Sequence, residues 1–325
     1  MWIKTFAAVM GLALSLMGGT VQSQNFPIPG KTMRIIVPFT PGGQTDTQAR
    51  FLAQRLTGIL DIPVVVENKP GASTIIGAME VVKAQPDGHT LLYTIAATAM
   101  QNPHLFSKLP YSVEKDLTPI MFAATSPMIL VASQNAPFKT FSEMMRYAKE
   151  NPNTVNFAST SAGGISHLNG ELLKSNGAVD IVHIPFKGTS EAMTALLGGH
   201  VHLLFDGPAT AIENAKAGKV HLLAIADERR SKAAPHVPTL TEEGVPGVDM
   251  PGGMQFFGPG NMPPDIADQV NAALKRAINV PEMLEMYRTG GNEPMLSSAA
   301  QHKEIIETQS KRWGKVIRQQ NIRLD

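Results

Sequence analysis

The sequence predicts an α/β protein with open, doubly wound sheets, arranged in two lobes. Strand-like and helix-like segments alternate along most of the chain, and repeated strand–helix units of this kind imply right-handed crossovers. Most strand candidates are continuous apolar runs, which are typical of strands buried on both faces of a parallel sheet. The length of 325 residues is sufficient for two domains of ordinary size.

Apolar and β-branched runs mark the strands along the chain. The strand candidates are residues 33–39, 63–68, 89–95, 128–133, 155–159, 181–186, 201–206 and 220–226. The segments between them predict helices over 47–60, 74–84, 141–150, 166–175, 190–197 and 210–217. Capping-box spacing predicts three helix starts: Thr45 with Gln48, Thr140 with Glu143, and Ser298 with Gln301.

The C-terminal third differs from the rest of the chain. Residues 245–264 are rich in glycine and proline, and residues 266–316 read as largely helical. Trp313 lies in the last long helix, where we expect it to pack in a core rather than touch a ligand. The pattern fits two strand–helix lobes and a helical tail. The chain would then cross between lobes twice, near 124–128 and near 235–240.

The charge balance argues against binding to nucleic acid or to an anionic membrane. The chain has 28 basic and 27 acidic residues, and its densest basic pair is Arg229-Arg230. Such a balance creates no field that would hold a polyanion. The sequence contains no cysteine, so we expect neither a disulfide framework nor a lipidated anchor.

The N-terminus has the pattern of a secretory signal peptide over residues 1–23. Lys4 supplies a short positive region, residues 5–17 are apolar, and residues 21–23 fit a cleavage site. The mature chain would begin near Gln24 and, without a later run of about 18 apolar residues, would be soluble. These features fit an exported, periplasmic protein. The alternative is an uncleaved membrane anchor.

A first glycine turn, at Gly42-Gly43, lies within VPFTPGGQTDTQAR (residues 37–50). The apolar run 33–39 ends at Pro41-Gly42-Gly43 and passes directly into a helical pattern. The glycines allow a sharp turn and close backbone approach, and the helix start directs N–H groups at one point that suits an anion. Asp46 either favours the helix dipole or, if an anion binds here, orients water or a backbone amide.

A second glycine turn, at Gly163-Gly164, lies within ASTSAGGISHL (residues 158–168). It also follows a strand and precedes a helix, and Ser159, Thr160 and Ser161 supply hydroxyls beside it. These features indicate a second anion cradle. The alternative is an ordinary capped strand–helix turn, although a cap would use only one hydroxyl.

A third turn of this type occurs in IPFKGTSEA (residues 184–192). Phe186 could pack on the apolar face of a ligand, and Thr189 is the expected N-cap after Gly188. We expect Lys187 to point into solvent.

Asp206 closes the strand candidate 201–206, just before Gly207-Pro208. A carboxylate at the carboxyl end of a parallel strand is where open α/β sheets bind ligands. Asp206 could equally cap the helix that begins near Thr210, and both interpretations stay open.

Other motifs fail. Gly30-Lys31-Thr32 resembles the end of a P-loop, but Asn25 stands where that motif requires glycine. The serines of the second glycine turn lack the flanking glycines of a nucleophile elbow. His200 and His202 would share one face of a strand, but no Cys, Asp or Glu joins them at ligand spacing. We therefore expect no metal, no cofactor and no catalytic set.

Six segments in order carry a resemblance to a known family. They are VPFTPGGQTDTQAR, VVVENKPGAS, AQPDGHTLL, ASTSAGGISHL, IPFKG and VPTLTEEG. Together they resemble the solute-binding proteins of tripartite tricarboxylate transporters, often called the Bug family. The likeness covers residues 35–322.

The resemblance implies a two-lobed periplasmic-binding-protein fold of type II, which closes on a small carboxylate like a Venus flytrap. The loops 41–46 and 159–167 would form the two jaws, partly through bound water. Lobe 1 would comprise residues 26–125 and 240–325, and lobe 2 residues 126–239. The resemblance also implies delivery to a membrane permease with large and small subunits, although some members feed signalling proteins. A monomer is expected.

The expected ligand-binding residues combine the three turns, the carboxylates and one further threonine. They are Phe39, Thr40, Pro41, Gly42, Gly43, Asp46, Thr98, Ser159, Thr160, Ser161, Gly163, Gly164, His167, Phe186, Gly188, Thr189 and Asp206. The chain departs from the family pattern at His89, where an aromatic is usual, and at Phe186, where Tyr is frequent.

The leading hypothesis is binding of a carboxylate without catalysis. The ligand would be a dicarboxylate or tricarboxylate, an aromatic carboxylate or an amino acid, and Asp206 in a cleft would favour a ligand with an amino or hydroxyl group. One alternative is a sensor subunit that presents its ligand to a receptor. The other is a secreted hydrolase that uses Ser161 or Ser159 with His167.

Overall fold

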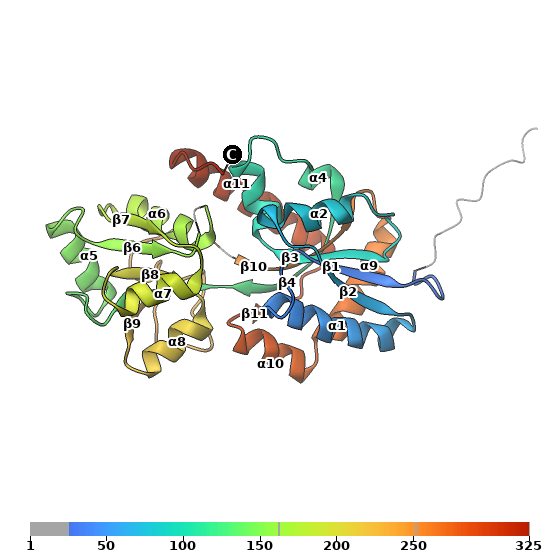
Figure 1. Ribbon diagram of the computed structural model, residues 1–325, viewed down its shortest axis with the longest axis horizontal. Coiled ribbons are helices and arrows are strands. Elements are labelled where there is room, and N and C mark those ends of the chain that lie inside the picture. The colour runs from blue at the N-terminus through green and yellow to red at the C-terminus, as the bar shows by residue number, and fades with distance from the viewer. Residues whose placement is uncertain (1–25, 162, 251, 325) are drawn as a thin grey trace, which may run out of the picture.

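The protein consists of two lobes, each built on one open sheet with helices packed on it (Figure 1). The computed structural model describes residues 26–161, 163–250 and 252–324, so the predicted signal peptide lies outside the described residues. The larger sheet has the strand order β11-β4-β10-β3-β1-β2, and the smaller has the order β7-β6-β8-β5-β9. The predicted α/β class with two lobes is confirmed. Among the described residues, no helix combines the length and hydropathy that a membrane crossing requires.

The strands and helices alternate through both lobes. The strands are β1 (Met33–Val37), β2 (Val64–Asn68), β3 (Thr90–Ile95), β4 (Leu117–Ser126), β5 (Met128–Ser133), β6 (Asn156–Ser159), β7 (Val182–Pro185), β8 (Leu203–Asp206), β9 (Val220–Ala226), β10 (Gly252–Pro259) and β11 (Glu293–Pro294). The helices are α1 (Gln44–Leu60), η1 (Ala72–Thr74), α2 (Ile75–Val82), η2 (Ala97–Gln101), α3 (Asn102–Leu105), α4 (Val113–Asp116), α5 (Phe141–Glu150), α6 (Ile165–Gly177), α7 (Thr189–Leu197), α8 (Pro208–Lys216), α9 (Pro264–Ile278), α10 (Pro281–Thr289) and α11 (Ala299–Gln319).

All the predicted strands are present, but the larger sheet contains strands that the sequence did not reveal. The strand β10 lies between β3 and β4, yet its sequence GGMQFFGP begins with glycine and ends with proline. It therefore lies inside the segment that we read as glycine- and proline-rich. The strand β4 was also missed, and it includes Pro119. Both are strands because neighbouring strands pair with them along their length.

The sheets are mixed rather than parallel throughout, which corrects the prediction of parallel strands. The strand–helix units pair in parallel, as β1 does with β2 and β3, and β6 with β7 and β8. In contrast, β10 is antiparallel to both of its neighbours, and β5 is antiparallel to β8 and β9. These two strands enter their sheets directly from the other lobe, without the crossover helix that parallel pairing requires.

The chain passes from the larger sheet to the smaller one at Pro127, between β4 and β5. On the return, residues beyond 235–240 still contact the smaller lobe. The Leu240 N–H donates to the Ile225 carbonyl over 2.9 Å, and the Asn176 side-chain amide donates to the Pro246 carbonyl over 2.9 Å. These contacts favour a second crossing beyond Pro246. The domain limits themselves stay a prediction.

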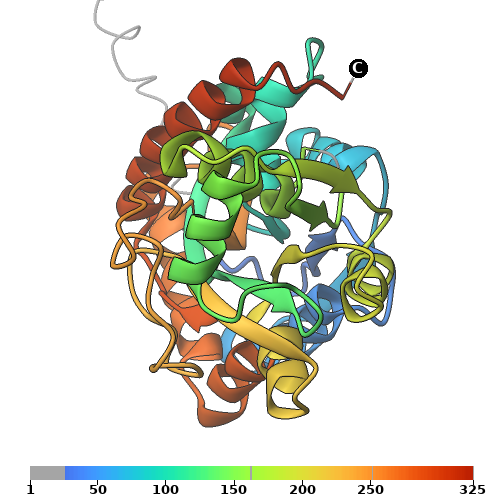
Figure 2. The same ribbon diagram turned by 90° about the vertical axis from the view of Figure 1, so that its left-hand side faces the viewer.

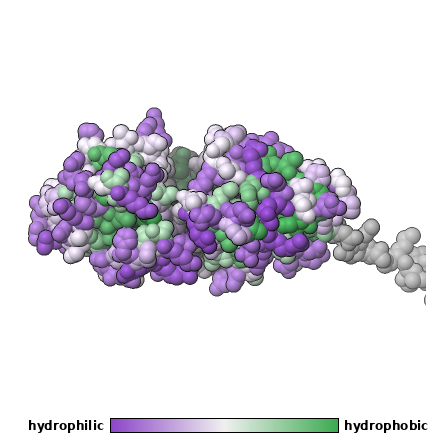
Figure 3. Space-filling model, turned by 90° about the horizontal axis from the view of Figure 1, so that it is seen from below, coloured by the Kyte–Doolittle hydropathy of each residue, from purple (hydrophilic) through white to green (hydrophobic). Residues whose placement is uncertain are grey.

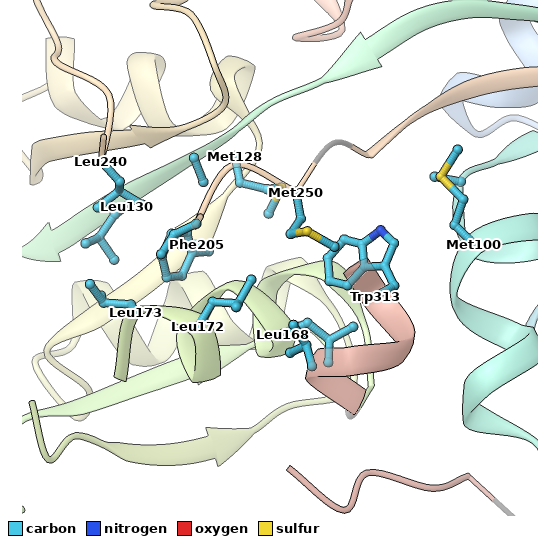
Figure 4. Close-up of a cluster of buried hydrophobic side chains, with 14 of the residues drawn as sticks. Met100, Met128, Leu130, Leu168, Leu172, Leu173, Phe205, Leu240, Met250 and Trp313 are labelled. Carbon is cyan, nitrogen blue, oxygen red and sulfur yellow. The ribbon is translucent and has the colours of Figure 1, made fainter. Parts of the chain in front are cut away.

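The C-terminal helix α11 packs against the smaller lobe. It begins with the predicted capping box of Ser298 and Gln301, and the capping box at Thr140 is present as well. Figure 2 shows α11 running beside the smaller lobe, and Figure 4 shows the Trp313 indole next to Met250 and Leu168 of that lobe. Trp313 is fully buried, as expected. The core therefore continues from one lobe into the other.

Candidate functional site

A cavity of about 590 Å³ is lined by residues of both lobes. In the space-filling view, the surface narrows between the two lobes (Figure 3). The lining residues are Pro38, Phe39, Thr40, Pro70, Gly71, Ser73, Thr74, Ile95, Ala96, Ala97, Gln101, Asn102, Leu105, Ser126, Met128, Thr160, Ser161, Gly163, Gly164, Ile165, Gly252, Gly253 and Leu324. None of these described residues carries a charged side chain. Hydroxyls, amides and glycine backbone therefore provide its polar groups.

The cavity brings together residues that precede the first glycine turn and residues of the second glycine turn. The predicted site residues that line it are Phe39, Thr40, Thr160, Ser161, Gly163 and Gly164. The predicted residues outside its lining are Pro41, Gly42, Gly43, Asp46, Thr98, Ser159, His167, Phe186, Gly188, Thr189 and Asp206. Several of the latter hold the lining residues in place, as their hydrogen bonds show.

The first glycine turn is not capped as the sequence predicted. Helix α1 begins at Gln44 with Gly43 as its N-cap, so Thr45 already lies inside the helix and the predicted capping box is wrong. Gln48 is fully buried, and its side-chain oxygen accepts a hydrogen bond from the Tyr93 hydroxyl over 2.9 Å. Its side chain is committed to the core and cannot fold back onto the helix start.

The Asp46 carboxylate holds the first glycine turn in place through hydrogen bonds. Its carboxylate accepts the Gly42 N–H over 2.9 Å, the Arg50 Nε–H over 3.0 Å and the Asn68 amide over 2.9 Å. Burial acts to raise the pKa of Asp46, but these hydrogen bonds outweigh it and hold the pKa below its ordinary value. Asp46 therefore orients a backbone amide, which was one of the two roles that the sequence left open.

The second glycine turn has the same backbone form. Gly163 has φ +72° and Gly164 is the N-cap of α6 with φ −75°. The Gly163 N–H donates to His167 Nδ1 over 3.0 Å, and the Thr160 N–H donates to the Ser166 hydroxyl over 2.9 Å. The side chains of α6 thus hold the backbone that faces the cavity.

His167 lies in a cluster of uncharged imidazoles. Its ring stacks on His183 with a centroid distance of 3.8 Å, and its Nε2 lies 3.8 Å from Glu171 Oε1. Burial lowers the pKa of His167 to about 4, with a further contribution from His183, and burial alone lowers the pKa of His183 to about 4. Burial also raises the pKa of Glu171. His167 is therefore a neutral acceptor at pH 7.

The three ligand atoms of His167, Glu171 and His183 lie within 4.8 Å of one another, as a metal site would need. The hydrogen bonding does not fit a metal. Since His167 Nδ1 accepts the Gly163 N–H, the neutral ring carries its proton on Nε2, toward Glu171. A metal on Nε2 would move that proton to Nδ1, against the Gly163 N–H, whereas metal-bound histidines usually donate from the second nitrogen.

Of the two serine–histidine pairs in the hydrolase hypothesis, the pair of Ser159 with His167 does not form as predicted. The Ser159 hydroxyl lies 2.7 Å from His183 Nε2, rather than at His167, and Ser159 is fully buried. Neither residue lines the cavity. A substrate in the cavity would therefore not reach this hydroxyl in the described conformation.

Asp206, the last residue of β8, and Thr98, in η2, are both buried, and both bond to nearby residues. Asp206 accepts a hydrogen bond from the Thr210 hydroxyl, and burial raises the pKa of its carboxyl against the opposing effect of Thr210. Thr98 is fully buried, and its hydroxyl lies 2.8 Å from that of Thr74 and 2.7 Å from that of Thr94. Thr98 thus supports the cavity wall through Thr74, which lines it.

The third turn lies outside the cavity lining. Helix α7 begins at Thr189 with Gly188 as its N-cap, so the predicted cap at Thr189 is wrong by one residue. Gly188 has φ +148°, a conformation that favours glycine. Phe186 packs partly buried against a hydrophobic cluster of the smaller lobe.

The segment that follows β2 lines the cavity but was not among the predicted site residues. Pro70, Gly71, Ser73 and Thr74 line the cavity, and residues 72–74 all have positive φ, a rare state for residues other than glycine. The Asn102 amide donates to the Ser73 carbonyl over 2.7 Å and so braces this segment. The sequence did contain a signal for this segment, because it follows a strand just as the first glycine turn does. Since β2 pairs in parallel with β1, the carboxyl ends of the two strands lie at the same edge of the sheet.

Comparisons with known proteins give a matching family model, similar relatives and similar solved structures. The family model described as tripartite tricarboxylate transporter family receptor matches residues 48–322. Protein BugT of Bordetella pertussis is 30% identical over 318 residues, which cover 98% of each chain. The structure of MatC from Rhodopseudomonas palustris with bound malate is 32% identical, with TM-score 0.72 over 89% of this chain and 100% of that chain. R. palustris Rpa4515 with adipate is 28% identical, with TM-score 0.76 over 91% and 99%.

Proposed function

The chain belongs to the tripartite tricarboxylate transporter family of receptors, and we propose that it captures a small carboxylate in the cavity between its lobes. The observation that carries this proposal is the uncharged lining, which combines Phe39 and Thr40, just before the first glycine turn, with Gly163 and Gly164 of the second, at the start of α6. Helix starts offer N–H groups without intrahelical partners and a partial positive charge. Both suit a carboxylate.

Neutral donors are sufficient for useful affinity. Hydrogen bonds to a charged group contribute about 1.5–3 kcal/mol each, so three or four could support micromolar binding after the costs of ordering. Candidate donors are the hydroxyls of Thr40, Thr160 and Ser161 and the backbone beside them. The solved relatives with malate and adipate bound support a carboxylate as the ligand.

We further propose that this protein acts in the periplasm, without catalysis, and delivers its ligand to a permease with large and small subunits. The signal-peptide pattern of residues 1–23 supports export. The burial of Ser159 argues against this serine as a nucleophile. Asp46 and His167 would act by holding the turns rather than by touching the ligand.

Calorimetry against malate, adipate, benzoate and glutamate tests the binding proposal. We expect at least one ligand to bind with a dissociation constant in the micromolar range, and Ser161→Ala to weaken it about tenfold through the loss of one charge-assisted hydrogen bond. Ser190→Ala, an exposed position on α7 outside the cavity, is the matched control and should bind like the parent. If the folded protein gives no heat with any of these carboxylates, the proposal is wrong.

A further inference from the structure

Four apolar side chains, from segments far apart in the sequence, contribute to the cavity wall. Leu105 at the end of α3, Met128 at the start of β5, Ile165 at the start of α6 and Leu324 near the C-terminus all line it. None of these side chains offers a hydrogen bond. Any part of a ligand that lies against this wall must therefore be apolar or lose its bonds to water.

Leu324 is placed by the chain that precedes it. The helix α11 is anchored through the buried Ile317, and the Ile322 N–H donates to the Ile317 carbonyl over 3.0 Å. The Leu324 N–H then donates to the Leu105 carbonyl over 3.0 Å. This bond sets Leu324 beside Leu105, and we call these two residues the leucine pair. The Leu324 side chain is 37% exposed, so part of it remains free to meet a ligand.

The second glycine turn of the smaller lobe lies directly against the leucine pair. A Cβ added to Gly163 would lie 3.2 Å from Leu105 Cδ2 and 3.4 Å from both Leu324 methyl carbons. Gly163 also has φ +72°, so glycine serves both the backbone conformation and the close approach. The leucine pair therefore adjoins the point at which a carboxylate would meet the second turn.

This arrangement places two different environments in one cavity. A carboxylate at the second glycine turn would leave the rest of the ligand near the leucine pair. Burying one methylene there favours binding by about 0.8 kcal/mol, or about fourfold in affinity. A hydroxyl or second carboxylate against the same wall would lose its hydration without a partner.

We propose that the leucine pair is a specificity-determining wall, which selects carboxylates with an apolar body of several carbons over short, polar dicarboxylates and tricarboxylates. This inference rests on the proposed function, since it assumes that a carboxylate binds in the cavity at the second glycine turn. It commits to a ligand class: alkyl or aryl carboxylates rather than hydroxy acids such as malate.

A chain-length series on the unaltered protein gives the first test. Calorimetry with acetate, butyrate and hexanoate, and with succinate, adipate and malate, compares bodies of different length and polarity. We expect affinity to rise about threefold to fourfold per methylene from butyrate to hexanoate, and adipate to exceed succinate and malate. Affinity that is flat or falling with chain length, or binding of malate alone, would overturn the inference.

A substitution at the exposed member of the pair gives the second test. Leu324→Ser should weaken hexanoate about fivefold to tenfold and change acetate less than twofold, because acetate offers only one methyl group to the leucine pair. Met295→Ser is the matched control, since Met295 is 45% exposed and lies outside the cavity lining. Equal losses for hexanoate and acetate would also contradict the inference. If the folded parent binds no carboxylate of any length, the proposed function itself fails.

Discussion

The two glycine turns share one backbone form but use different chemistry to hold it. In each turn a glycine with positive φ, +85° at Gly42 and +72° at Gly163, precedes a glycine N-cap with φ near −75°. In each, a side chain four residues later accepts the first glycine's N–H: Asp46 over 2.9 Å and His167 over 3.0 Å.

The difference lies in the acceptor. Asp46 is a charged carboxylate, also bound by Arg50 and Asn68, whereas His167 is a neutral imidazole stacked on His183. The same turn can therefore be built from an ion or from an uncharged ring. The first should tolerate acid down to the lowered pKa of Asp46, and the second should fail once His167 gains a proton on Nδ1.

The largest expected effect is the loss of the acceptor in the first turn. Asp46→Ala removes the buried carboxylate that accepts from Gly42, Arg50 and Asn68, and we expect the free energy of unfolding to fall by about 2–4 kcal/mol, because each hydrogen bond to a charged group contributes about 1.5–3 kcal/mol. Urea unfolding followed by circular dichroism measures this. Glu285→Ala, which removes an exposed pair with Arg288, should change stability by less than about 0.5 kcal/mol. A loss as small for Asp46→Ala would show that the turn does not need its carboxylate.

The second effect is a difference between the two turns in how their contribution to the free energy of unfolding depends on pH. The pKa of His167 is about 4 in the folded protein against an ordinary 6.5, so the unfolded chain binds more protons between these values. This contribution to stability is complete above pH 6.5 and is lost progressively as the pH falls toward 4. His183 has a similar shift and contributes in the same direction.

His167→Gln keeps an acceptor that does not titrate. We expect this variant to show a shallower fall in the free energy of unfolding between pH 6.5 and 4 than the parent, measured by urea unfolding at several pH values. Asp46→Asn should retain the parent's slope in that window, because the stability from Asp46 is lost only as the pH falls below 3.8 through its lowered pKa. Identical slopes for His167→Gln and the parent would exclude His167 as a source of acid sensitivity.

The third effect compares the positive-φ glycines. Gly42→Ala should cost about 1 kcal/mol from backbone strain alone, because an added Cβ there meets no described atom within 4 Å. Gly163→Ala should cost more, since its Cβ would press on the leucine pair. Thermal and urea unfolding of the two variants tests the order. Equal losses in the free energy of unfolding would indicate that the Leu324 and Leu105 side chains can move away from the added Cβ without a penalty.

The smallest effect concerns the hydroxyls beside the turns. Ser166→Ala removes the acceptor of the Thr160 N–H and should cost about 1 kcal/mol. Thr45→Ala should cost less than about 0.5 kcal/mol, because Gly43, not Thr45, is the N-cap of α1. A larger loss for Thr45→Ala than for Ser166→Ala would reverse our account of how the turns are capped.

Local chemistry explains which features the sequence revealed. The capping boxes at Thr140 and Ser298 were found because a cap joins residues only three positions apart. The apolar runs of β1 and β5 were found because strands in a buried sheet are apolar on both faces. The glycine turns were recognised because glycine alone adopts positive φ without strain.

Features that depend on distant partners were missed. The strand β10 exists through its pairing with β3 and β4, and its own residues read as a loop. The segment at Ser73 and Thr74 joins the cavity because β2 lies beside β1. The burial of Asp206 and Thr98 was equally hidden, since no local pattern shows that they lie outside the cavity lining.

The sequence by itself determined the α/β class, the strand–helix units and the two glycine turns, because each depends on residues that are neighbours in the chain. Tertiary structure decided which groups face the cavity and which stand behind it. Asp46 and His167 looked like ligand contacts, but the fold directs both at glycine N–H groups. Leu324, with no signal of its own, reaches the cavity only because α11 packs against the smaller lobe and its own N–H bonds to Leu105.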